Sequence, residues 1–191
     1  YVRRRDYIFF NPEIKYLFIP NKLVVAHGPY LDLESYYSLD FDKLDHTLEV
    51  GYAVEFDGQT TLSAGMSDIQ VKLTEDFDPT HVSEVTLPAG SDYRYRQWYT
   101  EVKTSPRRPL NGSLMYAKGG FFSGNVDVVE ANLVYRYQPY LNLSVNTVYT
   151  DLRLPAPFAH HRFWLIGPKL DITFSPKVYL TTFVQYNEQL N

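Results

Sequence analysis

The clearest hydrophobic pattern in the chain lies between Gly124 and Asp151. Apolar and polar residues alternate there in two segments, which are separated by Gln138-Pro139-Tyr140. A period of two indicates a β-strand with one apolar face and one polar face. The pattern therefore predicts a β-hairpin that turns at Pro139.

Folding this hairpin at Pro139 sets residues of the same kind opposite each other, and cross-strand pairs of this sort stabilise a sheet. The predicted pairs are Tyr137 with Leu141, Tyr135 with Leu143, Leu133 with Val145 and Val129 with Tyr149 on the apolar face, and Arg136 with Asn142 and Asn132 with Asn146 on the polar face.

The two strands are long, whereas a strand of a soluble sheet usually has about five or six residues. Residues 141–149 alone would extend over about 27 Å at ~3.4 Å per residue. At a barrel tilt of ~40° they would cover roughly 20 Å of height, close to the ~25 Å apolar band of an outer-membrane barrel. Strand length therefore favours a membrane-spanning sheet.

Similar alternation recurs along the chain and predicts about ten strands and no long helical stripe. The first strand is predicted either as one long strand or as two short ones meeting at Asn11-Pro12, because proline is confined to edges and bulges. Tight turns and longer connections are expected to alternate, as in outer-membrane barrels. The tight turns are predicted near Pro20, Asp57, Pro106, Pro139 and Pro176, and the longer connections near Asp42, Asp78, Phe121 and Pro155.

These features predict an all-β fold, an antiparallel up-and-down transmembrane β-barrel. Residues 1–191 are expected to form part of a single outer-membrane barrel domain, with no second domain. Both Tyr1 and Asn191 fall within the strand pattern, so the barrel is expected to be incomplete at both ends. A soluble β-sandwich is the competing fold.

The alternation also predicts which way the side chains face. The predicted lipid-facing residues are Leu133, Tyr135, Tyr137, Leu141, Leu143, Val145, Tyr149, Trp164, Ile166, Ile172 and Phe174. The predicted lumen-facing residues are Glu130, Asn132, Arg136, Asn142, Asn146, Lys169 and Asp171. Charges of both signs in the lumen are expected to pair. Aromatic girdles at the membrane interfaces are predicted from Tyr135, Tyr137, Tyr149, Trp164, Phe174 and Tyr186.

Composition narrows the chemistry. The chain has no cysteine, which excludes disulfides and thiolate zinc sites. No run approaches the roughly 18 apolar residues of a transmembrane helix. The net charge is −4 and the run Arg3–Arg5 is short, so nucleic-acid binding is not expected.

Catalytic signals are sparse: we predict no catalytic, metal or cofactor-binding residues, and no catalytic motif in the sequence indicates an enzyme. Glu75, Asp76 and Asp78 could supply a carboxylate pair or calcium ligands, but a solvated acidic loop is the simpler interpretation. The alternative function is a soluble carbohydrate-active enzyme or lectin domain with its site in the loop 74–91. His160 and His161 could ligate a metal only poorly, because adjacent strand residues point to opposite faces.

Several segments together resemble one family. They are NPEIKYLFIP at 11–20, LPAGSDYRYRQW at 87–98, GGFFSG at 119–124, YLNLSVNTVYTDLRLP at 140–155 and ITFSPKVYLTTFVQYNEQLN at 172–191. The chain resembles the C-terminal β-barrel domain, of unassigned function, of Gram-negative outer-membrane proteins that carry an N-terminal family-nine-type carbohydrate-binding-like domain.

The resemblance implies a location in the bacterial outer membrane and a role as membrane anchor or conduit. It implies further strands beyond Asn191 and carbohydrate binding by a domain that precedes Tyr1, so no sugar-binding residue is assigned within 1–191. The expected partners are outer-membrane lipid and possible further outer-membrane subunits.

Overall fold

The computed structural model describes residues 6–20, 23–80, 85–158 and 160–188. The Arg3–Arg5 run, part of the turn after Pro20 and residues 81–84 of the acidic loop lie outside these ranges. Strands make up the fold, and none of the described residues forms a helix that could cross a membrane. The strands are β1 (Tyr7–Phe10), β2 (Glu13–Lys15), β3 (Val24–Ser38), β4 (Lys43–Phe56), β5 (Thr61–Lys72), β6 (Asp92–Lys103), β7 (Leu110–Phe121), β8 (Gly124–Tyr137), β9 (Leu141–Arg153), β10 (His160–Ser175), β11 (Val178–Phe183) and β12 (Tyr186–Asn187).

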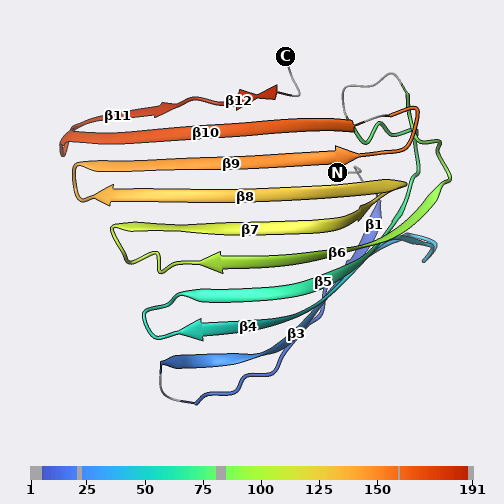
Figure 1. The fold of residues 1–191 in the computed structure, drawn as a ribbon, viewed down its shortest axis with the longest axis horizontal. Helices are drawn as coiled ribbons and strands as arrows, with labels where there is room; N and C mark the ends of the chain where they lie inside the picture. The colour runs from blue at the N-terminus through green and yellow to red at the C-terminus, as the bar shows by residue number, and fades with distance from the viewer. Residues whose placement is uncertain (1–5, 21–22, 81–84, 159, 189–191) are drawn as a thin grey trace.

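All twelve strands belong to one antiparallel up-and-down sheet (Figure 1). Strands β3 to β11 follow one another in chain order, and β2 and β12 pair with β3 and β10. The predicted all-β meander is confirmed, and the two extra strands arise because the first and last predicted strands are each interrupted. The sheet is open among the described residues, with β1 and β2 at one edge and β11 and β12 at the other.

The first edge shows what Pro12 does. Phe10 pairs with Ser35 and Glu13 with Asp32, so the register against β3 is the same on both sides of the break. Pro12 lacks an N–H, but its carbonyl still accepts a hydrogen bond of 3.1 Å from the Leu33 N–H. Proline therefore interrupts an edge strand without producing a bulge.

The register of the β8–β9 hairpin agrees with the sequence prediction. Each of the six predicted pairs occurs, from Tyr137 opposite Leu141 to Val129 opposite Tyr149. The pairing continues to Asn125 opposite Arg153, so the hairpin is longer than its clearest hydrophobic stretch.

The predicted alternation of connection lengths is confirmed only in part. At the end of the sheet on the right of Figure 1, which we call the loop end, the connections are 39–42, 73–91, 122–123 and 154–159. At the opposite end, the turn end, they are 57–60, 104–109, 138–140 and 176–177. Only 73–91 is long.

The expected long connection near Phe121 is instead the two-residue turn 122–123. Gly119 and Gly120, which were expected in the loop, belong to strand β7, and the backbone of the neighbouring strand β6 comes very close to them. A Cβ at Gly119 would lie 2.1 Å from the Arg96 carbonyl oxygen, and one at Gly120 would lie 2.6 Å from the Tyr95 Cβ. Glycine at these positions therefore reflects backbone approach within the sheet.

The buried core lies at the loop end. The described residues of the connection 73–91, namely 73–80 and 85–91, are called the cap. They run along the strand ends (Figure 1) and pack against the polar face of the sheet. The ring of Phe122 lies 5.3 Å from that of Phe77 in the cap and 5.2 Å from that of Tyr93. The buried apolar residues are Leu73, Leu87, Phe122, Val126, Leu152, Leu154 and Phe158.

Candidate functional site: the two faces of the sheet

One face of the sheet is apolar and exposed from edge to edge. Cross-strand pairing aligns its residues from β2 to β11, for example Val102 beside Leu114 and Leu133 beside Val145. The side chains are large, and Trp98 is 64% exposed and Leu133 55% exposed. The exposed members of this apolar face are Ile14, Val50, Tyr52, Leu62, Trp98, Leu110, Leu114, Tyr116, Leu133, Tyr135, Tyr137, Leu143, Trp164, Leu180 and Tyr186.

The residues predicted to face lipid lie on this apolar face. The pairs Leu133–Val145 and Leu141–Ile172 place them there across β8, β9 and β10. Phe174 lies at a register shift between Thr173 and Ser175 and is exposed. The predicted lumen-facing residues share the opposite, polar face, as the pairs Asn132–Asn146 and Asn142–Asp171 require. Contact with lipid or with a lumen stays a prediction.

Aromatic residues gather toward both ends of the apolar face. Tyr135 and Tyr137 lie at the turn end, while Tyr149 and Trp164 lie near the loop end with ring centroids 4.7 Å apart. Pairing places Tyr116 and Trp98 beside them on β7 and β6, and sequence reasoning missed both. The sequence contained a signal for both positions: Tyr116 is two residues from Lys118, and Trp98 is two residues from Arg96, so each aromatic marks the change from apolar to charged residues along its strand.

The middle of the polar face carries two tyrosines above two glycines. The row across β3 to β6 reads Tyr30, Gly51, Gly65 and Tyr99. The hydroxyl groups of Tyr30 and Tyr99 meet above the glycines, and the Tyr99 hydroxyl donates a hydrogen bond of 2.6 Å to Glu49 Oε1. This cluster was not predicted, because it joins residues 69 positions apart.

Charges on the polar face form ion pairs within single strands, and pairing across a lumen stays a prediction. Lys169 Nζ lies 3.1 Å from Asp171 Oδ2, which also accepts a hydrogen bond from Asn142. Lys103 Nζ lies 2.7 Å from Glu101 Oε2. A hollow of about 300 Å³ surrounds the tyrosine cluster, and its charged lining is Glu13, Lys15, Asp32, Glu49, Glu101 and Lys103. Acidic residues predominate in this part of the face.

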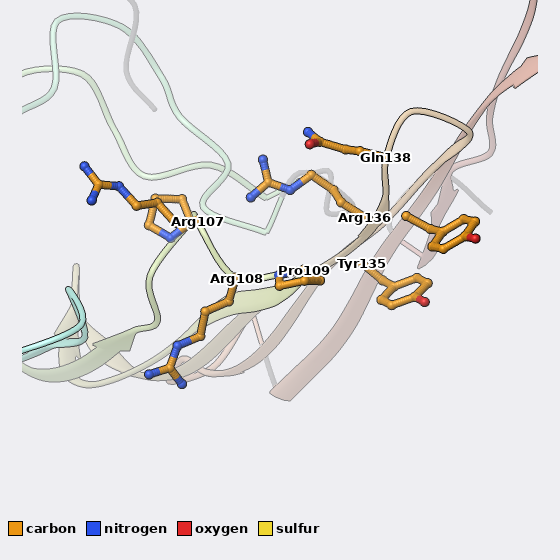
Figure 2. Close-up of a pocket in the computed structure, with 8 residues that line it drawn as sticks. Arg107, Arg108, Pro109, Tyr135, Arg136 and Gln138 are labelled. Carbon is orange, nitrogen blue, oxygen red and sulfur yellow. The ribbon is translucent and has the colours of Figure 1, made fainter. Parts of the chain in front are cut away.

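The turn end of the polar face is basic. A hollow of about 550 Å³ extends around this end, and its lining consists of Pro106, Arg107, Arg108, Pro109, Tyr135, Arg136, Tyr137 and Gln138 (Figure 2). Figure 2 shows Arg136 and Gln138 extending to one side of the sheet and Arg108 to the other. Among the described residues, no carboxylate makes an ion pair with Arg107 or Arg136. These guanidinium groups are available to an anion in the hollow.

The two adjacent histidines point to opposite faces, as expected. His160 Nε2 lies 2.7 Å from Asp151 Oδ1, and His161 Nε2 lies 2.7 Å from the Phe158 carbonyl oxygen. Across the described ranges, no group of three or more His, Asp and Glu side chains could hold a metal ion.

The acidic residues of the cap stabilise its own turns. Asp76 Oδ1 accepts a hydrogen bond of 2.8 Å from the Ala89 N–H. Asp78 Oδ1 accepts hydrogen bonds from the Thr80 N–H at 2.8 Å and the Thr80 hydroxyl at 2.7 Å. The Asp78–Thr80 bonds are typical of an Asx turn, whereas the Asp76–Ala89 bond joins two segments of the cap 13 residues apart, so both carboxylates have a structural role.

Comparison with known proteins assigns no family to this chain. No protein-family model matches the sequence, and no curated protein matches it significantly.

Proposed function

We propose that this chain is part of an outer-membrane β-barrel that serves as a membrane anchor or conduit. The observation that carries the proposal is the exposed apolar face, which extends over strands β2 to β11 without a covering layer among the described residues. Monomeric soluble proteins rarely expose contiguous apolar patches larger than a few hundred Å². Lipid would cover this face in a bilayer.

Strand length supports the same proposal. Strands β3 to β10 have 12 to 16 residues each, against about five or six in a typical soluble sheet. Aromatic residues near both ends of the apolar face correspond to the interfacial girdles of transmembrane barrels.

The sheet edges also favour a barrel. Ile14 on β2 is 66% exposed and Tyr179 on β11 is 78% exposed. Edge strands with exposed apolar side chains invite pairing with further strands, and closure removes such edges. Strands from outside residues 1–191 would complete the barrel.

The conduit role draws support from the polar face. It carries an acidic region around Glu49 and a basic hollow at Arg107 and Arg136. Charged groups lining a pore select the ions that pass. The proposed link to carbohydrate binding rests on family resemblance alone and concerns a domain outside residues 1–191.

Extraction of the full-length protein tests the proposal. We expect it to sediment with membranes, to resist carbonate or high-salt washing, and to require detergent for solubility. A protein that enters aqueous buffer without detergent and stays monodisperse would refute the barrel. The soluble-enzyme alternative has no supporting observation, because Asp76 and Asp78 hold cap turns.

A further inference from the structure

Charged residues replace apolar ones at the loop end of the apolar face. On β6 the stripe passes from Trp98 to Arg96, and on β10 from Trp164 to Arg162. The charges form two neighbouring clusters, one on β5 and β6 and one on β7 to β10, which together we call the charged belt. The pairing of β6 with β7 ends at Gln97 and Gly119, with Trp98 opposite Lys118. The belt consists of Asp68, Arg94, Arg96, Lys118, Asp127, Asp151, Arg153, His160 and Arg162.

Three aspartates organise the basic side chains of the belt. Asp68 accepts hydrogen bonds from Arg94 Nε at 2.8 Å and Arg96 Nε at 2.9 Å. Asp127 lies 3.2 Å from Lys118 Nζ and 3.0 Å from Arg153 Nη2.

Asp151 gathers three basic groups. It lies 3.1 Å from Arg153 Nε, 2.7 Å from His160 Nε2 and 3.5 Å from Arg162 Nε. Arg153 therefore joins Asp127 to Asp151, and the belt is continuous from β7 to β10.

The two signs of charge lie at different depths. The aspartate side chains are only 9–14% exposed. The side chains of Arg94, Arg96, Lys118 and Arg162 are 62–69% exposed. With Arg153, five basic residues cover three carboxylates, so the surface that meets the surroundings is positive. A set of ion pairs with equal numbers of acidic and basic groups would present no excess of positive charge.

The belt lies directly beyond the aromatic residues Tyr116, Tyr149 and Trp164, and Trp98 lies opposite Lys118 of the belt. Tyrosine and tryptophan concentrate where the hydrocarbon core meets the headgroups. If the apolar face contacts lipid, as in the proposed function on which this inference rests, the belt is at headgroup depth.

We propose that the charged belt binds the phosphate groups of anionic lipids in the leaflet at the loop end. The guanidinium fork matches phosphate geometry and bonds to it in a bidentate manner. The aspartates hold the arginines in place, which lowers the entropy lost on binding. The longest connection, 73–91, lies at this end, and the longer loops of such barrels are extracellular, so the partner is the phosphorylated glycolipid of the outer leaflet.

The double variant Lys118→Gln with Arg162→Gln tests this site without leaving a carboxylate alone. Asp127 keeps Arg153 and the Tyr116 hydroxyl, and Asp151 keeps Arg153 and His160. The matched control, Lys103→Gln with Lys169→Gln, removes the same charge from the polar face, outside the basic hollow.

Binding is measured on the full-length protein in a neutral detergent, with bisphosphorylated lipid A, its dephosphorylated form and inorganic phosphate as probes. A basic residue near an anionic surface contributes roughly fivefold in affinity, so we expect about a 25-fold loss in the double variant. The control variant should bind lipid A like the wild type. Dephosphorylated lipid A and inorganic phosphate should bind far more weakly.

Equal binding of lipid A by the double variant and the control would overturn the belt as a phosphate site. Inorganic phosphate binding as tightly as lipid A would overturn the lipid as its partner. In both cases the protein would still require detergent, so the proposed barrel would stand. A protein soluble without detergent would overturn both proposals.

Discussion

Tyr30 on β3 and Tyr99 on β6 meet through their hydroxyl groups although two strands lie between them. Gly51 and Gly65 on the intervening strands make this possible, because each ring lies where a side chain would otherwise stand. The polar face is thereby bridged at its centre by an aromatic pair that ends on Glu49.

Replacing Gly65 with alanine should destabilise the sheet. The new Cβ would lie 2.6 Å from the Tyr99 hydroxyl oxygen and 2.7 Å from the Val50 carbonyl oxygen, and the latter belongs to the backbone. Overpacking of this kind costs about 1–3 kcal/mol. Thermal unfolding followed by circular dichroism measures the effect. Gly167→Ala is the control, because its nearest neighbour is 3.4 Å away, and equal stability of the two variants would contradict the packing described.

A charge on the apolar face should be far more costly than a charge on the polar face next to it. Leu133 lies in the middle of the apolar stripe of β8, and Val134 points to the opposite face. An arginine at the bilayer midplane of a barrel costs about 2–4 kcal/mol. We expect Leu133→Arg to lose this much unfolding free energy in lipid vesicles and Val134→Arg much less. Similar losses in both variants would exclude lipid contact at Leu133.

Truncating Phe122 should release the cap. Its ring packs on Phe77, Tyr93 and Phe121, and removing a buried phenylalanine costs about 3–5 kcal/mol. We expect Phe122→Ala to expose the cap to protease at low enzyme concentration. Leu39→Ala, at a side chain that is 65% exposed, serves as the control and should leave the digestion pattern unchanged.

Removing the cap carboxylates should loosen the cap locally. Asp76→Ala and Asp78→Ala each delete acceptors of backbone N–H groups, at a net cost of about 1 kcal/mol for each hydrogen bond. Hydrogen exchange of the cap amides should accelerate about fivefold while membrane insertion stays unchanged. The matched control is Glu75→Ala, which removes an exposed carboxylate and should leave hydrogen exchange of the cap amides unchanged. Loss of an enzymatic or sugar-binding activity in these variants would instead support the soluble-domain alternative.

Neutralising the basic hollow at the turn end should reduce any preference for anions. Arg107 and Arg136 line the hollow without a carboxylate partner among the described residues, and arginines lining a pore favour anions. Arg107→Gln with Arg136→Gln should shift the reversal potential in a KCl gradient toward cation selectivity. Lys177→Gln should not, because Lys177 lies in the turn 176–177 and does not line the hollow. An unchanged potential in the double variant would argue against conduction past this hollow.

The sequence by itself determined the strands, the β8–β9 register and the two faces. Side chains alternate strictly along a strand, so a stripe such as Leu141 to Tyr149 leaves one choice of face. The sequence was less informative about connections. Gly119 and Gly120 were predicted to lie in a loop, whereas they allow the close approach of the neighbouring strand β6, which the sequence does not reveal.

Only the tertiary structure decided how the surfaces are organised. The cap folds back over the polar face because Leu73 and Leu87 find Phe122 and Leu152 there, which a one-dimensional pattern does not encode. The meeting of Tyr30 with Tyr99 and the charged belt likewise join residues from several strands. Each strand contributes only one or two charges to the belt, and its two clusters depend on the register of β5 with β6 and on the registers of β7 to β10.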